Sequence, residues 1–411
     1  MILKRIWNRL LRWFLDSIWV TFKLAIIAGV IALGSCTTAR TILKQAPVDL
    51  PKDWQPSERL NLPAARARAL LESEIYGEMD LRPVVEVLSF ETLPTDFARA
   101  KVTQWRLRVD YGAVARDLDV VLLMPEDRPN APVILSQNFC PNNDVVPLNG
   151  VRSPDGAGSG CSGGGLFAAL MTNVFGRYIV QPPIQNILDR GYGFAAMYPS
   201  QFVPDRSVEG IETLDSLFPE TPNRPGALAV WSNLFNVAAQ TIEAELGERP
   251  MIAYGHSRFG KTALLAGAWS GDIDAVIAHQ SGTLGASAMD DKDGEPLGAL
   301  LDGYPHWAGP GLNRYSDRPN SLPVRPSDLL AQLGDKPVLL GNARRDVWSD
   351  PWGAFTEAKV AWGDEFGALD PADFRPFDAK AYWLRPGTHG VVKEDWPAFL
   401  NFLDSNISIT D

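Results

Sequence analysis

The strongest candidate for a catalytic residue in the sequence is one serine in a short segment that contains two glycines. Ser257 lies in the segment Gly-His-Ser-Arg-Phe-Gly-Lys-Thr (255–262), which follows the apolar run 251–254 and precedes a helical pattern. The spacing matches the phosphate-binding P-loop. It also approximates a nucleophile elbow, in which a sharp bend between a strand and a helix exposes a serine hydroxyl. The match to the elbow is imperfect because its second glycine comes one residue late, at Gly260.

Residues further along the chain favour one of these two interpretations. A P-loop usually follows the first strand of its domain and needs a carboxylate after a second apolar strand. A nucleophilic serine instead needs an acid after a later strand and a histidine after the last strand. Asp346 follows the apolar run 337–341, and His389 follows the run 382–384. The order serine, aspartate, histidine therefore predicts that Ser257 is a nucleophile whose proton passes to His389.

The elements that must position these residues alternate along the chain. Apolar runs bounded by turn residues predict strands, and stretches of helical periodicity lie between them. The predicted strands are 105–109, 118–124, 133–135, 194–198, 251–254, 275–278 and 338–340, and the predicted helices are 64–76, 184–188, 227–246, 262–269, 329–333 and 352–361. This alternation predicts an α/β-hydrolase fold, a doubly wound and mostly parallel sheet with antiparallel N-terminal strands in a three-layer sandwich. The polar, glycine-rich stretches 141–181 and 284–325 are expected to be loops over the carboxyl edge of the sheet.

Composition limits the class of protein and its partners. The 411 residues are 45% hydrophobic and 21% charged, with a formal net charge of −11, which is typical of a globular protein. Binding of nucleic acid is not expected, because no basic surface emerges beyond the extreme N-terminus. Without an internal repeat or a second linker, residues 61–408 are predicted to form one catalytic domain after a linker at 37–60.

The first 36 residues are predicted to be a targeting segment. The uncharged stretch 24–33 suits a signal-peptide core better than a membrane-spanning helix, which needs about 20 apolar residues. It leads into Leu-Gly-Ser-Cys, which resembles a bacterial lipobox and predicts lipidation of Cys36. The alternative is an uncleaved anchor in which residues 18–33 span the membrane. Both interpretations predict a membrane-attached domain outside the cytoplasm, in the periplasm or at the outer membrane of a bacterium.

Cys140 and Cys161 lie within one loop-rich stretch. An oxidising compartment would permit a disulfide between them. The sequence does not fix the distance between the two residues, so the pairing stays open at this point.

Several short segments around these residues form a recognisable set. They are the elbow Gly-His-Ser-Arg-x-Gly-Lys, Asn138-Phe139, Tyr198 with Pro204-Asp205, and the stretches 304–307, 346–351 and 387–389. Together they resemble the corresponding segments of bacterial glucuronoyl esterases. The resemblance covers roughly residues 50–405. It implies a serine esterase without metal or other cofactor that hydrolyses the ester of (4-O-methyl)glucuronic acid on xylan with an alcohol such as those of lignin. An esterase for acetyl or small alkyl esters is the alternative, and a non-catalytic sugar-binding lipoprotein is a third hypothesis.

The resemblance also implies a role for each residue of the site. Ser257 is the nucleophile, His389 the base, Arg258 a donor to the developing oxyanion, Lys261 a contact to the sugar hydroxyls, Glu295 a ligand of the sugar, and Trp348 a surface for its ring. Structural alternatives exist for four of them: a capping or paired Arg258, a solvated Lys261 or Glu295, and a core Trp348. The remaining histidines, His256, His279 and His306, are expected to be structural.

Two departures from the pattern of the relatives concern charge. Many relatives place the acid of the triad where this chain has Gln280, so the acid is predicted to be Asp346, with Asp350 as the alternative. An arginine pair expected shortly before Glu295 is replaced by Asp290 and Asp291. This replacement reverses the local charge near the predicted site and weakens the prediction of an anionic, polymeric substrate.

Overall fold

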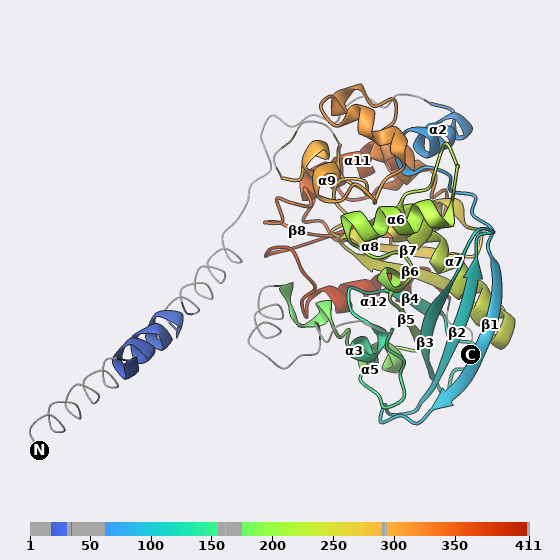
Figure 1. Cartoon of the computed structure of the whole chain (residues 1–411), viewed down its shortest axis with the longest axis vertical. Helices are drawn as coiled ribbons and strands as arrows, with labels where there is room; N and C mark the ends of the chain where they lie inside the picture. Colours follow the sequence, from blue (N-terminus) through green and yellow to red (C-terminus); the bar gives the residue numbers. More distant parts are fainter. Residues whose placement is uncertain are drawn as a thin grey trace, which may run out of the picture. The chain divides into compact units, whose positions relative to one another are not determined.

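The computed structural model describes residues 18–30, 34, 62–154, 161, 175–289, 292 and 294–408 (Figure 1). The chain divides into two compact units, Met1–Val48 and Asp49–Asp411. In the first unit, residues 18–30 are helical. Among the described residues no helix is both long and apolar enough to cross a membrane. Cys36 and the predicted linker 37–60 lie outside the described residues, so lipidation and the linker stay predictions.

The second unit is built on one sheet, which has nine strands among the described residues. Its order is β1-β2-β3-β5-β4-β6-β7-β8-β9. The strands are β1 (Val84–Leu93), β2 (Ala100–Asp110), β3 (Ala115–Pro125), β4 (Val133–Gln137), β5 (Gly193–Met197), β6 (Met251–His256), β7 (Ala275–His279), β8 (Val338–Ala343) and β9 (Lys380–Arg385). Strands β1, β2, β3 and β5 pair in antiparallel fashion, and β5, β4, β6, β7, β8 and β9 pair in parallel. This topology confirms the predicted mixed sheet.

Helices cover both faces of the sheet, which gives three layers. The helices are α2 (Ala64–Leu71), α3 (Asn142–Val145), α5 (Ile184–Asp189), α6 (Ser207–Leu217), α7 (Ala227–Leu246), α8 (Arg258–Trp269), α9 (Leu297–Gly303), α10 (Pro326–Ala331), α11 (Pro351–Trp362) and α12 (Asp395–Asn406). One core cluster joins the sheet to α7, α8, α10 and α11, and the other joins it to α5 and α12. Alternate residues of β6 enter opposite clusters: Met251 and Ala253 pack in the first, Ile252 and Tyr254 in the second. Because both faces are buried, the strand is a continuous apolar run in the sequence.

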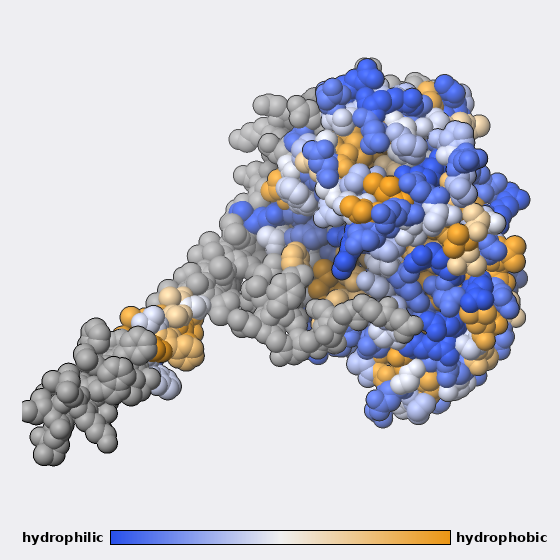
Figure 2. Space-filling view, in the orientation of Figure 1, coloured by the Kyte–Doolittle hydropathy of each residue, from blue (hydrophilic) through white to orange (hydrophobic). Residues whose placement is uncertain are grey.

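Several elements of the structure are absent from the prediction. The edge strand β1 has no clear apolar alternation, because its outward side chains include Val84 and Phe90, which are 74% and 42% exposed. Strand β1 runs along the right edge of the view in Figure 1, and Figure 2 shows hydrophobic residues mixed with hydrophilic ones on that side of the surface. Helix α9 interrupts the stretch 284–325 that was expected to be loop, so that prediction is wrong over these seven residues. The predicted helix 64–76 is confirmed and ends in a π-helical turn, Glu72–Tyr76.

A disulfide joins Cys140, directly after the loop residue Phe139, to Cys161. The two Cα atoms are 5.9 Å apart, which is within the range that a disulfide requires. The structure therefore resolves the pairing that the sequence left open.

Candidate active site

Ser257 lies at the sharp turn between β6 and α8. Its backbone has φ 57° and ψ −123°, a conformation that non-glycine residues rarely adopt and that recurs at functional sites. Glycines make the turn possible: a side chain at Gly255 would collide with the carbonyl of Phe259, and one at Gly260 would lie 3.0 Å from the carbonyl oxygen of His279. The turn is therefore a nucleophile elbow. Its late second glycine is needed where the helix passes close to the neighbouring strand β7.

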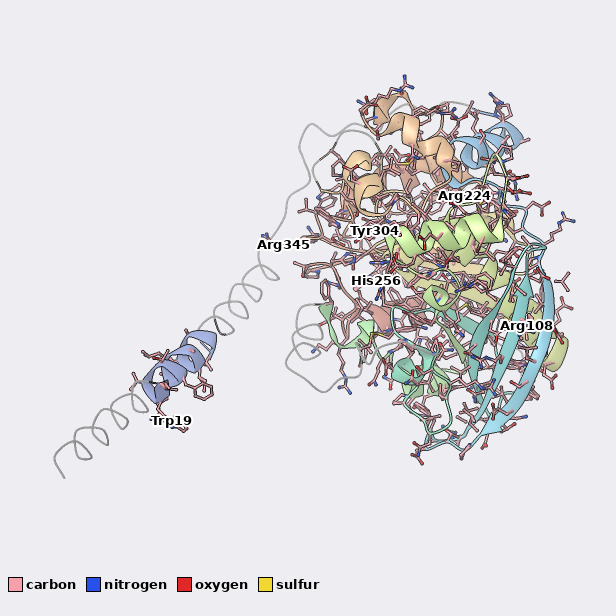
Figure 3. The ribbon with its side chains drawn as sticks, viewed as in Figure 1. Trp19, Arg108, Arg224, His256, Tyr304 and Arg345 are labelled. Atoms are coloured by element: carbon pink, nitrogen blue, oxygen red, sulfur yellow. A yellow bond between two sulfur atoms is a disulfide. The ribbon has the colours of Figure 1, made fainter. Side chains whose placement is uncertain are left out.

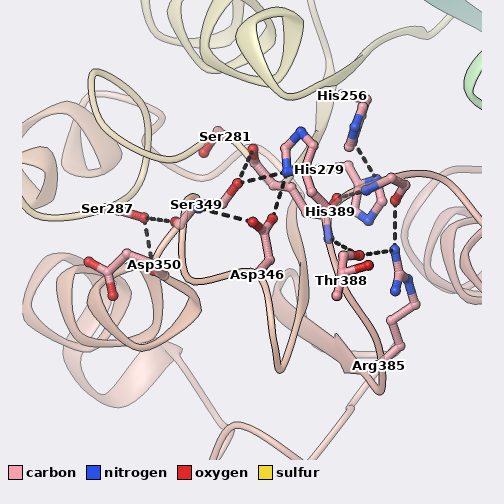
Figure 4. Close-up of polar contacts among 12 residues, drawn as sticks. His256, His279, Ser281, Ser287, Asp346, Ser349, Asp350, Arg385, Thr388 and His389 are labelled. Atoms are coloured by element: carbon pink, nitrogen blue, oxygen red, sulfur yellow. Dashed lines mark hydrogen bonds and ion pairs between the residues drawn. The ribbon is translucent and has the colours of Figure 1, made fainter. Parts of the chain in front are cut away.

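His389 lies in the loop after β9 and faces Asp346 in the turn after β8 (Figure 4). Its Nδ1 atom is 2.7 Å from Oδ2 of Asp346 and 3.1 Å from Oγ of Ser349. The backbone N–H of Ser349 donates to Oδ1 of Asp346 at 3.1 Å. Burial alone would raise the pKa of Asp346, but His389 and Ser349 outweigh it and hold that pKa below its ordinary value. An ionised Asp346 can therefore orient the imidazole.

Asp350 has a different task in the same turn. Its side chain accepts a hydrogen bond from the backbone N–H of Gly353 and so caps α11. Its Oδ2 atom is also 3.3 Å from Nζ of Lys292. Of the two aspartates that the sequence offered, Asp346 is the one that contacts His389.

The imidazole of His389 packs on the ring of His256, the residue before Ser257, with the ring centroids 4.6 Å apart. This contact brings the histidine loop against the elbow. Among the described residues no hydrogen bond joins Oγ of Ser257 to His389. Such bonds are often long without substrate and shorten in the reacting complex.

The other three histidines are buried, as expected for structural residues. Burial and the neighbouring cationic groups lower the pKa of His256 and of His279 well below the ordinary value. Burial also lowers the pKa of His306 to about 4. All three are therefore neutral near pH 7. Nδ1 of His256 lies 3.1 Å from Nδ1 of His279, so one ring donates to the other.

Arg258 follows the nucleophile, and its guanidinium is enclosed by aromatic rings. The ring centroids of Phe139, Tyr304 and Trp307 lie 5.3, 5.5 and 5.1 Å from its Cζ atom. Asp205 forms an ion pair with it. The predicted alternative of a paired arginine is thus correct in part, but the pairing fixes the cation beside the elbow rather than on the outer surface. Figure 3 labels Tyr304 and His256, and it shows Arg108 of β2 further toward the right edge of the view.

Lys261 and Glu295 are both buried, so the alternative that they are solvated is wrong. Nζ of Lys261 donates to the carbonyl oxygen of Ser281 at 2.6 Å and lies 5.5 Å from the centroid of the Trp307 ring. Burial lowers the pKa of Lys261 to about 8, and the charge of Glu295 opposes that shift. Burial lowers the pKa of Arg258 too, with Glu295 again among the opposing groups. The Glu295 carboxylate therefore acts electrostatically on both cations.

Trp348 is 56% exposed, so it is not a core aromatic. It lies two residues after Asp346, in the turn whose backbone also approaches Gly294: a side chain at Gly294 would collide with the carbonyl of Val347. The turn thus brings an exposed indole and the segment before Glu295 to the same region.

Three residues of the site were missed as functional residues in the sequence. Asp205 accepts hydrogen bonds from Nε2 of His306 and Nε1 of Trp307 at 3.0 and 2.8 Å, besides pairing with Arg258. Ser349 contacts His389, and Phe139 packs against Arg258. All three residues lie in segments that carry the family resemblance, Pro204-Asp205, 346–351 and Asn138-Phe139, but the sequence alone assigned none of them a role. Asp290 and Asp291 lie outside the described residues.

The described residues contain no group of three or more histidine, cysteine, aspartate or glutamate side chains that could hold a metal ion.

The mixed sheet with its serine elbow after β6 defines the class: the protein has the α/β-hydrolase fold. Within that class, the chain resembles glucuronoyl esterases of carbohydrate esterase family 15. A glucuronoyl esterase from Solibacter usitatus has a TM-score of 0.70 at 25% sequence identity, covering 88% of this chain and 99% of the other. A promiscuous esterase of the same family, from a marine bacterial metagenome, has a TM-score of 0.69 at 22% identity, covering 88% and 98%.

In sequence, the chain is 30% identical over 245 residues to carbohydrate esterase MZ0003 of an unknown prokaryotic organism. The match covers 55% of this chain and 56% of that protein, so the chain spans about half the length of this relative. No protein-family model matches the chain. These comparisons confirm the predicted fold and the predicted resemblance.

Proposed function

We propose that the protein is a serine esterase that hydrolyses carbohydrate esters through an acyl-enzyme on Ser257. The observation that carries the proposal is the strained serine on its elbow beside a histidine whose Nδ1 is bound by a buried carboxylate. The similarity to a carbohydrate esterase and to glucuronoyl esterases supports the class of substrate.

The first chemical step is proton removal from Ser257. Because Asp346 accepts a hydrogen bond from the Nδ1–H group of His389, the unprotonated Nε2 atom is left as the base. As the hydroxyl attacks the ester carbonyl, His389 takes its proton and then returns it to the leaving alcohol. Water, activated by the same imidazole, hydrolyses the acyl-enzyme.

Two hydrogen-bond donors of one residue, Arg258, can stabilise the negative charge that develops on the carbonyl oxygen. The backbone N–H of Arg258 lies in the first turn of α8, where amide groups have no partner within the helix. The Arg258 guanidinium is the second donor, held by Asp205 and the aromatic rings. Each fixed donor of this kind contributes about 3 to 4 kcal/mol to the stability of the transition state.

The sugar is proposed to bind between Lys261, Glu295 and Trp348. A cation and a carboxylate that lie close together suit hydroxyl groups, which both donate and accept hydrogen bonds. An exposed indole suits the apolar face of a pyranose ring. We propose the ester of (4-O-methyl)glucuronic acid on xylan as the substrate and an alcohol of lignin as the leaving group. Acetyl and small alkyl esters are the alternative.

An ester panel on the full chain tests this proposal. We expect turnover of benzyl or methyl glucuronate to exceed that of p-nitrophenyl acetate, and Ser257→Ala to lose both activities. Ser216→Ala removes an exposed serine of α6 and serves as the matched control. Hydrolysis that survives in Ser257→Ala would refute the esterase, and a preference for the acetate by orders of magnitude would favour the alternative substrate.

We further propose that the protein is attached to the cell envelope, with its catalytic domain outside the cytoplasm. The Leu-Gly-Ser-Cys segment ending at Cys36 and the disulfide at Cys140 support this location, because disulfides persist in oxidising compartments. We expect Cys36→Ser to move the protein from the membrane fraction to the soluble fraction. Retention of that variant in membranes would favour an uncleaved anchor.

A further inference from the structure

The side chain of Gln280, directly after β7, bonds the peptide groups on both sides of His389. Its Oε1 atom accepts a hydrogen bond from the backbone N–H of Gly390 at 2.8 Å. Its Nε2 atom donates to the carbonyl oxygen of Thr388 at 3.4 Å. Gln280 is 1% exposed, so these bonds are made without competing water.

A second buried side chain, that of Arg385, holds the same loop (Figure 4). Arg385 donates to the carbonyl oxygens of Thr388 and Gly390 at 3.1 and 2.6 Å. Its Nε atom is fixed by both oxygens of Asp395, at 2.9 and 3.0 Å. The loop around His389 is thus held through its backbone, while the imidazole itself contacts Asp346 and Ser349.

The loop needs such support because glycines flank the histidine. Gly387 and Gly390 have φ values of 108° and 140°, which favour glycine and leave the backbone with few steric limits of its own. The place of the imidazole therefore depends on the hydrogen bonds that fasten the loop.

Gln280 also connects the loop to the turn that carries the acid. Its carbonyl oxygen accepts a hydrogen bond from Oγ of Ser349 at 3.1 Å, and that hydroxyl lies 3.1 Å from Nδ1 of His389. Gln280 has φ 52°, a conformation that costs about 1 to 3 kcal/mol in a non-glycine residue and that recurs at functional sites. We propose that Gln280 is a positioning residue that sets the place of the His389 imidazole between Ser257 and Asp346. The inference rests on the proposed esterase function.

The amide group is chemically specific for this position. It offers one acceptor to the Gly390 N–H and one donor to the Thr388 carbonyl. An ionised carboxylate offers acceptors alone, so in Gln280→Glu it would face the Thr388 carbonyl oxygen without a proton to share. A protonated carboxyl could replace both contacts.

Two variants of the full chain test the proposal. Gln280→Asn keeps the amide and tolerates a positive φ, but it is one methylene too short for both contacts. Gln280→Glu keeps the length and loses the donor when ionised. Gln332→Glu is the matched control, since the Gln332 amide donates to the Ala64 carbonyl, outside the site described above.

We expect Gln280→Asn to lower kcat for a glucuronate ester about 10- to 100-fold, with KM changed by less than about 2-fold. Gln280→Glu should lose activity relative to the unaltered protein as the pH rises from about 5 to about 8, because the new carboxyl ionises over that interval. Melting temperatures are measured alongside. A wild-type kcat in Gln280→Asn, a flat activity ratio in Gln280→Glu, or an equal loss in Gln332→Glu would overturn the proposal.

Labelling by a fluorophosphonate probe separates this inference from the proposed function, because the probe reports serine activation without requiring the natural substrate. Equal labelling of the unaltered protein and Ser257→Ala would refute the esterase itself. If the unaltered protein is labelled through Ser257 and Gln280→Asn reacts at the same rate, the esterase stands and Gln280 is not a positioning residue. Slower labelling of Gln280→Asn at an unchanged melting temperature supports the proposal.

Discussion

The Nδ1 atom of His389 lies 2.7 Å from the Oδ2 atom of Asp346. Asp346 is 2% exposed, so this contact is made in a region with little water, where a charged hydrogen bond is strong.

Asp346→Asn is expected to lower kcat about 10⁴-fold, because an amide in place of the carboxylate favours the wrong tautomer of the imidazole. Asp350→Asn should leave kcat unchanged and cost at most about 1 kcal/mol of unfolding free energy, since an asparagine also caps a helix. Steady-state kinetics and denaturant unfolding of both variants provide the check. Equal losses of kcat in the two variants would contradict the assignment of Asp346.

Asp205→Asn is expected to reduce kcat about 10-fold by loosening the Arg258 guanidinium, and Arg258→Gln should reduce it about 100-fold by removing the donor. If Asp205 acts through Arg258, the double variant should resemble Arg258→Gln alone. Kinetic measurement of the complete double-mutant cycle tests this coupling. Additive losses would show that Asp205 affects the reaction by another route.

The lowered pKa of Lys261 predicts that substrate binding depends on pH. Its pKa is lowered to about 8 by burial, so the cation that would face the sugar is lost as the pH rises through that value. We expect KM for a glucuronate ester to increase between about pH 7 and pH 9. Lys261→Met should have a higher KM that stays constant over the same interval. A rising KM in Lys261→Met would place the titrating group elsewhere.

The fold was largely predictable because buried parallel strands leave long apolar runs in the sequence. The run at 251–254 is apolar throughout since both faces of β6 are covered. Strand β1 lies at the edge of the sheet with exposed apolar side chains, and it has no comparable pattern. The antiparallel start of the sheet was therefore predicted only from β2 and β3.

The site was predictable where chain order determines it and not where local backbone geometry does. Ser257, Asp346 and His389 follow the parallel strands β6, β8 and β9, so the topology brings them to one edge of the sheet. Asp350 is only four residues from Asp346, but its backbone conformation and its hydrogen bond from Gly353 direct it to cap α11 instead of contacting His389. The partner of Arg258, Asp205, is distant in sequence and is reached only through the folded chain.

Trp348→Ala is expected to raise KM about 5- to 10-fold without changing kcat, because the exposed indole would lose its contact with the sugar ring. The melting temperature should stay within about 1 °C, since an exposed side chain contributes little to the core. Val347→Ala is the matched control, because Val347 is the neighbouring residue and is 61% exposed. A fall in melting temperature without a change in KM would assign Trp348 a structural role.

The disulfide between Cys140 and Cys161 is expected to stabilise the folded domain. Closing a loop with a sequence separation of 21 residues reduces the entropy of the unfolded chain and contributes roughly 3 kcal/mol. Serine at both positions should therefore lower the unfolding free energy by about that amount in denaturant titrations. A thiol reductant should destabilise the unaltered protein to the same level and leave the double variant unchanged.

The same double variant should also lose activity. Because Phe139 precedes Cys140 and packs on Arg258, kcat should fall in this variant. Unaltered unfolding curves would show that the crosslink is dispensable.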